Sequence, residues 1–196
     1  MKINNVLLVL FCFGILFGGD IDRQLIMAGK NKKEIKKALR KAPKAHRGGM
    51  HWLIKHMPDE DLKSVTSEFL LENCEFAYKA WKETSWGRKI PEDVFFEYVL
   101  PFANLNEKRE SWRKDFYYRF SDIMRNSASA YQAAASLNNN MFEMVGVKYS
   151  TKRPKADQSP YESMDAGLAS CTGLSILLIE YFRLNGAFVL DGMRDY

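Results

Sequence analysis

The sequence predicts an α+β protein that is predominantly helical, and three observations support this. Apolar residues recur at helical spacing through most of residues 20–144, as on the buried stripe of an amphipathic helix. The pattern then stops, because Val145–Tyr149 is a short strand candidate and Ser150–Asp165, with two prolines, has no periodicity. A last apolar run, Leu174–Ile179, predicts one further helix.

We therefore divide the chain into residues 1–19, a helical region over residues 20–144 and a smaller core over residues 145–196. With 46% hydrophobic and 27% charged residues, the chain has the composition of an ordinary globular protein. Its length is sufficient for a domain with a sizeable core.

The first 19 residues resemble a secretory signal peptide. Lys2 supplies the positive start, and Val6–Phe17 is an apolar stretch of signal-peptide length that is too short for a comfortable membrane span. Leu16 and Phe17 are poor residues before a cleavage site, so an uncleaved membrane anchor stays open. We expect a secreted or periplasmic protein in the first case and a membrane-anchored one in the second.

Breaker residues and local charge divide the helical region into separate elements. Prolines end several apolar segments, and the acidic run Asp59–Asp61 suits a helix start, where the helix dipole favours negative charge. His46–Gly49 is expected to be a loop. The expected helices are Lys32–Lys41, Met50–Met57, Asp59–Glu83, a short one between Pro91 and Pro101, Asn106–Met124 and Ser129–Met144.

The formal net charge is +5, and its excess is concentrated in Lys30–Lys44, where Glu34 is the single acid. Two interpretations stay open: a contact with phosphate or an anionic envelope surface, or a solvated helix face. Nucleic acid is not an expected partner, because Trp81 and Trp112 fall on apolar helix stripes and export separates the protein from nucleic acid.

The sequence predicts no metal and no cofactor. His46, His51 and His56 are five residues apart, which on a helix separates neighbours by about 140°, so they share no face. The cysteines lack zinc-finger spacing, and no carboxylate pair has the surroundings of an acid–base couple.

Cys171 is the candidate nucleophile. Ser170 is a suitable N-cap residue, so Cys171 falls in the first turn of the last helix, which buries Leu174, Leu177 and Tyr181. Unpaired N–H groups and the positive end of the helix dipole favour a thiolate there. The alternative is a structural cysteine that packs like a small apolar residue.

The remaining cysteines admit two arrangements. Cys12 would leave with the signal peptide, and Cys74 shares an apolar stripe with Ala77 and Trp81, which predicts a free, buried thiol. A disulfide between Cys74 and Cys171 stays open in an oxidising compartment.

Two stretches around Cys171 have a distinctive order of residues. They are Lys148-Tyr-Ser-Thr-Lys-Arg-Pro-Lys-Ala-Asp-Gln-Ser-Pro-Tyr-Glu-Ser163 and Gly167-Leu-Ala-Ser-Cys-Thr-Gly-Leu-Ser-Ile-Leu-Leu178. They resemble the nucleophile region of the transglutaminase-like superfamily, in its secreted bacterial branch with a helical N-terminal extension. Ala45–Leu62 and Leu105–Arg109 also resemble that branch, so the resemblance covers most of residues 42–184.

The resemblance implies a papain-like core, in which the nucleophile helix packs on an antiparallel sheet. It implies a Cys–His–Asp triad that performs acyl transfer on a protein or peptide, with Cys171 as the nucleophile. The family's histidine and aspartate follow the nucleophile helix, whereas Ala187–Tyr196 contains no histidine and matches that region poorly.

We therefore expect an incomplete papain-like core, truncated after the nucleophile helix and inactive by itself. Loss of the sheet would leave much of the apolar face of that helix uncovered. Two alternatives stay open: residues 30–144 act as a non-catalytic module that binds a cell-envelope glycan or protein, or a second chain supplies the His and Asp of a split enzyme.

Overall fold

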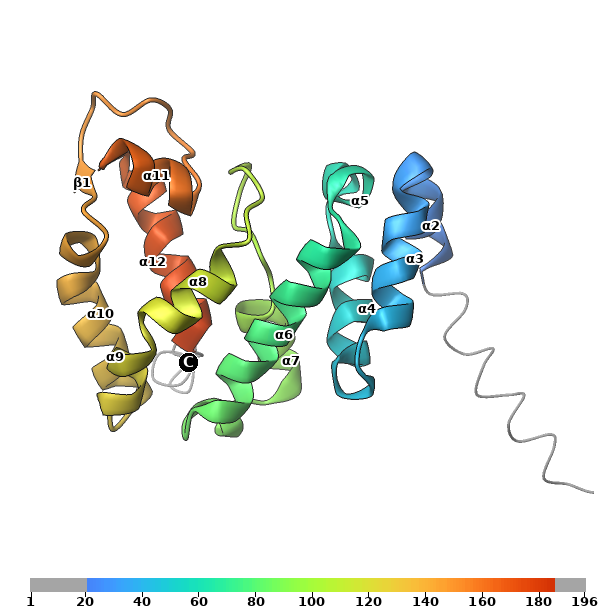
Figure 1. Cartoon of the computed structure of the whole chain (residues 1–196), viewed down its shortest axis with the longest axis horizontal. Coiled ribbons are helices and arrows are strands. Elements are labelled where there is room, and N and C mark those ends of the chain that lie inside the picture. The colour runs from blue at the N-terminus through green and yellow to red at the C-terminus, as the bar shows by residue number, and fades with distance from the viewer. Residues whose placement is uncertain (1–20, 186–196) are drawn as a thin grey trace, which may run out of the picture. The chain divides into compact units, whose positions relative to one another are not determined.

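The computed structural model describes residues 21–185, which are mainly helical with one small sheet (Figure 1). The chain divides into two compact units, unit 1 ending at Ser67 and unit 2 beginning at Glu68. The predicted boundary at residue 144 lies inside unit 2, and the predicted signal segment lies outside the described residues. None of the helices in residues 21–185 combines the length and apolar character that a membrane span needs.

The elements of unit 1 are helices α2 to α5 with two 3₁₀ turns. Their bounds are α2 (Asp22–Met27), η1 (Gly29–Asn31), α3 (Lys32–Lys41), η2 (Lys44–His46), α4 (Arg47–His56) and α5 (Asp59–Ser64).

Unit 2 contains the remaining helices and both strands. Their bounds are α6 (Ser67–Glu83, whose first residue belongs to unit 1), η3 (Gly87–Lys89), α7 (Glu92–Val94), the π-helix η4 (Phe95–Val99), α8 (Trp112–Arg119), α9 (Ser121–Asn126), α10 (Ala130–Met144), β1 (Lys148–Tyr149), α11 (Pro160–Ala166), β2 (Leu168–Ala169) and α12 (Cys171–Asn185).

Unit 1 buries one stripe of α3 against α4. Ile35 and Ala38 of α3 are fully buried, as are Met50 and Ile54 of α4. The predicted helix Lys32–Lys41 is confirmed with the same bounds. The predicted loop His46–Gly49 is wrong, because α4 begins at Arg47 and includes two glycines that the pattern assigned to a loop.

The predicted helix Asp59–Glu83 is interrupted between α5 and α6 by polar contacts with distant residues. The amide Nδ2 of Asn31 donates to the carbonyls of Leu62 and Val65 at 3.0 and 2.8 Å. The carboxylate of Glu34 accepts from the N–H and the hydroxyl of Ser67 at 2.8 and 2.6 Å. These contacts hold a break that local apolar spacing does not indicate, because their partners are more than 30 residues away.

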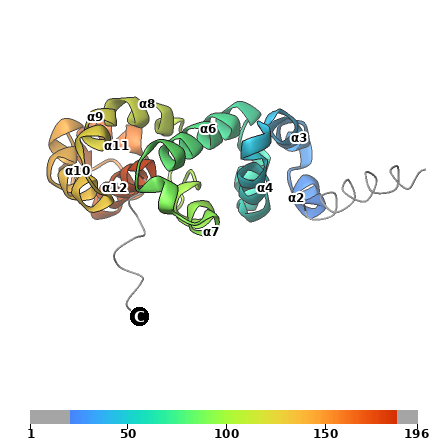
Figure 2. The same cartoon turned by 90° about the horizontal axis from the view of Figure 1, so that it is seen from below.

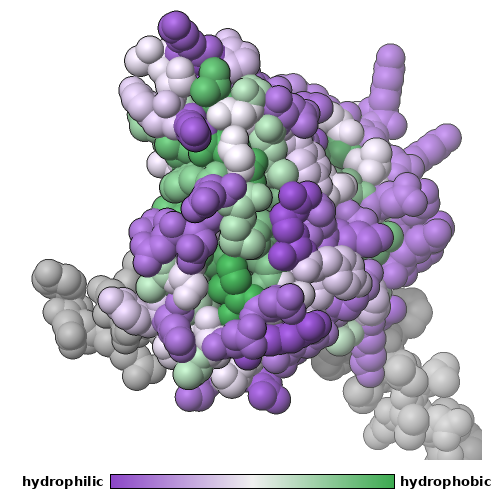
Figure 3. All heavy atoms as spheres, turned by 60° about the vertical axis from the view of Figure 1, so that its left-hand side comes forward, coloured by the Kyte–Doolittle hydropathy of each residue, from purple (hydrophilic) through white to green (hydrophobic). Residues whose placement is uncertain are grey.

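The core of unit 2 surrounds α12, which packs against α8, α10 and α11 (Figure 2). Tyr181 is fully buried, and its ring lies 4.1 Å from that of Phe120 and 4.8 Å from that of Phe116, between centroids. Trp81 and Trp112 are core residues, as predicted. On the side of the unit that carries α10 and β1, apolar surface lies between polar side chains (Figure 3).

The apolar face of helix α12 is covered, contrary to the expectation that it would be exposed. Leu177 and Tyr181 are fully buried, while Leu174 and Leu178 are partly buried against the same core. Three helices supply the cover that the resemblance assigned to a sheet. The antiparallel sheet itself does not occur in residues 21–185, and the predicted strand at 187–190 lies outside them.

The predicted helix Asn106–Met124 begins only at Trp112 and is divided into α8 and α9. The segment before it is held as a loop by Glu107, whose buried carboxylate accepts the N–H groups of Asn104 and Leu105 at 2.6 and 2.7 Å. A carboxylate that satisfies two backbone donors of its own loop favours that loop over a helix. The predicted helix Ser129–Met144 is confirmed as α10, with Ser129 as its N-cap.

Buried polar side chains fix the loop between η4 and α8. Four consecutive carbonyls, of residues 100–103, each accept a hydrogen bond from a side chain of α6, α8 or α12. The donors are Asn73 Nδ2 to Leu100 (2.9 Å), Arg113 Nη2 to Pro101 (2.6 Å), Trp112 Nε1 to Phe102 (3.3 Å) and Arg183 Nη1 to Ala103 (3.0 Å).

Glu180 of α12 completes this carbonyl-binding network. It is fully buried, and its Oε1 accepts from Asn104 Nδ2 at 2.7 Å and from Arg183 Nη1 at 3.0 Å. Burial raises the pKa of Glu180 to about 7, although the charges of Arg183 and Arg113 oppose the shift; Glu107 adds to it. Burial likewise lowers the pKa of Arg113 to about 9.

We predict that Glu180 makes unit 2 less stable as the pH rises. A pKa raised from 4.5 to about 7 means that the stabilisation from the protonated carboxyl is complete below pH 4.5 and is lost as the pH rises through 7. The loss is on the order of 3 kcal/mol. Glu180→Gln, which cannot ionise, should remove this part of the pH dependence.

The measurement is the free energy of unfolding in urea between pH 4.5 and 8. Glu143→Gln on the exposed side of α10 is the control and should keep the wild-type slope. Parallel curves for wild-type protein and Glu180→Gln would contradict the prediction.

Candidate active site

Cys171 is the first residue of α12, as predicted, and its side chain is exposed. The chain reaches it through β1, the loop 150–159, α11 and β2. Strands β1 and β2 are parallel, with Lys148 opposite Leu168 and Tyr149 opposite Ala169. The thiol therefore follows directly after a strand, at the point where the backbone turns into a helix buried on its apolar side.

The segment before Cys171 contains a helix that was predicted as loop. Helix α11 has Pro160 in its first turn and a capping box in which Ser159 and Glu162 bond reciprocally. Gly167 ends it in the left-handed conformation, with φ 62°, which glycine adopts without strain. These local signals were available in the sequence, and the absence of apolar periodicity in so short a helix concealed them.

Ser170 joins the start of α12 to the preceding loop. Its hydroxyl donates to the carbonyl of Ala156 and accepts from the N–H of Gly173 at 3.0 Å. Its carbonyl accepts from the N–H of Leu174 at 2.9 Å. The predicted N-cap role of Ser170 is thus confirmed. Through its bond to Ala156, the same side chain also holds the loop 150–159 against the start of α12.

The buried side of the first turn is closely packed. A Cβ placed on Gly173 would lie 3.2 Å from the Cβ of Ala169 and 3.3 Å from the hydroxyl of Ser163. Gln158, which is fully buried, donates from Nε2 to the carbonyl of Leu168 at 2.9 Å. These contacts leave little freedom in the position of the helix start.

Two backbone donors at the start of α12 are available to a ligand. The N–H groups of Gly173 and Leu174 are satisfied by Ser170. Those of Cys171 and Thr172 have no acceptor among residues 21–185. Free N–H groups at a helix N-terminus are suited to binding an oxyanion.

The structure separates the two described cysteines. Cys74 is 1% exposed on α6, Cys171 is exposed on α12, and both thiols are free. Burial raises the pKa of Cys74 to about 12, although the charge of Arg113 opposes the shift. The alternative of a Cys74–Cys171 disulfide is therefore not adopted, while Cys12 lies outside the described residues.

The structure brings no histidine to Cys171 within unit 2. His46, His51 and His56 all belong to unit 1, and the sequence of unit 2 contains no histidine. In residues 21–185 no three His, Cys, Asp or Glu side chains are grouped so that they could hold a metal ion. What the described site offers is therefore an exposed thiol and two free backbone donors, without a general base in the same unit.

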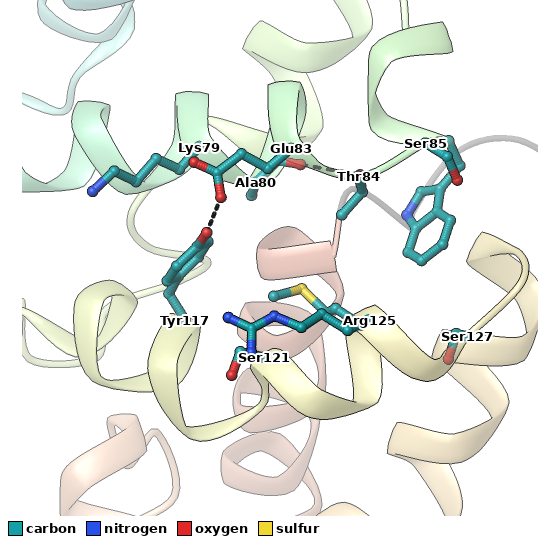
Figure 4. Close-up of a pocket in the computed structure, with 11 residues that line it drawn as sticks. Lys79, Ala80, Glu83, Thr84, Ser85, Tyr117, Ser121, Arg125 and Ser127 are labelled. Carbon is teal, nitrogen blue, oxygen red and sulfur yellow. Dashed lines mark hydrogen bonds between the residues drawn. The ribbon is translucent and has the colours of Figure 1, made fainter.

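A separate pocket of about 250 Å³ lies between α6 and the α8–α9 segment (Figure 4). The Glu83 carboxylate and the Tyr117 hydroxyl point toward one another there and form a hydrogen bond. Burial and this contact raise the pKa of Tyr117 to about 12. The lining comprises Lys79, Ala80, Glu83, Thr84, Ser85, Trp86, Tyr117, Ser121, Met124, Arg125 and Ser127.

This α6–α9 pocket was missed by sequence reasoning. Its charged and hydroxyl side chains come from segments about 40 residues apart, and none belongs to the loop, strand or helix around Cys171. No local motif marks such a set, because only the packing of the helices assembles it. The pocket is thus a second candidate site, separate from the thiol.

No family model matches the chain, and no curated protein or solved structure is significantly similar to it.

We predict that Ser170→Ala destabilises unit 2 by about 1 kcal/mol or more, since it removes the cap of α12 and the bond to Ala156. Thermal and urea unfolding measure the loss. Ser175→Ala, at an exposed position of the same helix, is the matched control and should change stability by less than about 0.5 kcal/mol. Equal effects of the two substitutions would show that Ser170 contributes nothing specific.

Proposed function

We propose that Cys171 is the nucleophile of a transglutaminase-like acyl-transfer site that acts on a protein or peptide. The observation that carries the proposal is an exposed thiol on the first residue of a buried helix. An exposed thiol can be reached by a substrate, and the thiolate is the reactive form of cysteine. The resemblance of Lys148–Ser163 and Gly167–Leu178 to the superfamily supplies the reaction class.

In this reaction the thiolate attacks an amide carbonyl carbon, and a C–S bond forms as the carbonyl oxygen becomes an oxyanion. The free N–H groups of Cys171 and Thr172 are the donors that would stabilise that oxyanion. The C–N bond then breaks, and a general acid must give a proton to the leaving amine. Water or a second amine releases the acyl group from sulfur.

The general acid–base group is the part that unit 2 lacks, because it has no histidine. We propose that a second chain supplies this imidazole and its orienting carboxylate, as in a split enzyme. The isolated chain then has a reactive thiol and little or no turnover of amides. The same proposal includes a papain-like arrangement of the completed site. It also includes export from the cytoplasm, for which the signal-like residues 1–19 would be the targeting segment.

Thiol labelling tests the nucleophile. At neutral pH iodoacetamide should modify Cys171 at least about 100-fold faster than Cys74, because Cys171 is exposed and burial raises the pKa of Cys74 to about 12. Peptide mass mapping assigns each modified residue and separates both from Cys12.

Cys171→Ser should lose the fast labelling, and Cys74→Ala should keep it. Equal labelling rates at Cys171 and Cys74 would remove the case for Cys171 as the nucleophile. Steady amide hydrolysis by the purified wild-type chain would instead contradict the need for an outside imidazole.

A second candidate function is binding of an envelope glycan in the α6–α9 pocket, favoured by the lining of that pocket. Five hydroxyl side chains, two cations and one carboxylate border about 250 Å³. Hydroxyl, carboxylate and guanidinium groups are the hydrogen-bonding partners that a sugar ring requires. In this case unit 2 acts as a binding module in which Cys171 has no role.

Calorimetry with an N-acetylglucosamine oligomer tests this second function. Arg125→Ala should weaken binding at least about tenfold, since a bond to a charged group contributes roughly 1.5–3 kcal/mol. Arg119→Ala, outside the pocket, is the control. Absence of binding to the wild-type chain, or equal loss in both variants, would exclude the pocket as a site for this glycan.

A further inference from the structure

Unit 1 presents a dense basic surface on α3 and the turns that flank it. The sequence from Lys30 to Arg47 contains nine Lys or Arg residues and one acid, Glu34. Eight of these nine basic side chains are exposed: Lys30, Lys32, Lys33, Lys36, Arg40, Lys41, Lys44 and Arg47. We refer to these eight as the α3 basic surface.

The buried stripe of α3 fixes which side of the helix faces outward. Ile35 and Ala38 are fully buried, and Ala42, just after the helix, is 3% exposed. Rotation of α3 about its axis, which would bring its lysines toward acidic groups, would expose this apolar stripe to water. The basic side chains stay at the surface of unit 1.

The one acid of the segment can offset only one of its nine positive charges. Glu34 is held by the N–H and hydroxyl of Ser67, and these bonds hold its pKa below the usual range. Its one ion pair in the segment is with Lys37, at 3.9 Å. Across residues 21–185, no carboxylate lies within ion-pair distance of the eight side chains of the α3 basic surface.

The position of this surface in the chain suggests what it faces. Lys30 lies only 13 residues after Phe17, the last residue of the uncharged stretch Val6–Phe17. Stable association with a bilayer generally takes two signals, one apolar and one basic, because a short apolar segment alone binds weakly. Clusters of four to eight Lys or Arg beside an apolar segment are typical of contact with anionic lipid.

The composition of the surface favours lipid over nucleic acid. Residues 30–47 contain no Phe, Tyr or Trp, the side chains on which unpaired bases stack. Six of the eight exposed side chains are lysines, which are point charges without the planar fork that reads base edges. A sheet of anionic headgroups requires only positive charge spread over a surface, which is what α3 presents.

We propose that the α3 basic surface rests on an anionic phospholipid bilayer. The partner is the phosphate-rich surface of the bilayer itself, bound through many weak contacts. This function is independent of Cys171 and of the α6–α9 pocket, and it holds or fails separately from the acyl-transfer proposal.

Vesicle sedimentation of the full 196-residue chain tests the proposal. The probes are phosphatidylcholine vesicles with either no or 30% phosphatidylglycerol, in low salt and in 0.5 M KCl. We expect binding to the anionic vesicles to exceed binding to the neutral ones and to weaken in high salt, because salt screens exposed charges. Soluble glycerol phosphate at millimolar concentration should not compete.

The decisive variant is the triple substitution Lys33→Glu, Lys36→Glu and Arg40→Glu. At about 1 kcal/mol per basic residue near the surface, loss of three cations should lower the partition coefficient about 100-fold or more. The matched control replaces three exposed basic residues of unit 2, Arg88→Glu, Lys89→Glu and Lys148→Glu, with the same change in net charge. Circular dichroism and thermal unfolding establish that both variants fold.

Three results would overturn the proposal. The first is equal binding to neutral and anionic vesicles, which would show that the basic side chains do not contribute to the association. The second is equal loss in the two triple variants, which would make net charge the cause. The third is binding of duplex or single-stranded DNA that depends on Lys33, Lys36 and Arg40 while vesicle binding does not.

Discussion

The architecture of unit 2 depends on the burial of Arg113, Glu180 and Arg183 against the loop of residues 100–109. Each of these side chains is at most 9% exposed, and burying an ionised group is costly unless it is paired and hydrogen-bonded. The loop meets that requirement, because its carbonyls accept from Arg113 and Arg183 and the amide of Asn104 donates to Glu180. These bonds fix α8 and α12 to the same loop. Because α12 carries Cys171 at its other end, the polar network also determines the axis along which the thiol is presented.

The sequence predicted well those features that depend on local chemistry. Helices α3 and α10, the core positions of Trp81 and Trp112 and the start of α12 at Cys171 follow from apolar spacing and caps. It failed where distant polar partners decide the backbone. The break before α6 is held by Glu34, and the loop before α8 is held by Glu107 and Arg113, and apolar spacing gives no signal for these contacts.

The candidate sites differ in the same way. Cys171 was singled out because a cysteine at a helix start has a local signature, and Ser170 beside it is part of that signature. The α6–α9 pocket has none, since its lining residues come together only when α6, α8 and α9 have packed. The resemblance to the transglutaminase-like superfamily placed a sheet beside α12, whereas α8, α10 and α11 cover that helix in the described structure.

The absence of a side chain at Gly173 has a consequence for how the thiol position is encoded. A Cβ added at Gly173 would lie 3.2 Å from the Cβ of Ala169 and 3.3 Å from the hydroxyl of Ser163. These two residues therefore pack closely against the inner side of the first turn of α12. A methyl group at position 173 would require these neighbours to shift by a few tenths of an ångström. The turn that carries the exposed thiol is therefore specified in part by a position without a side chain, two residues from Cys171.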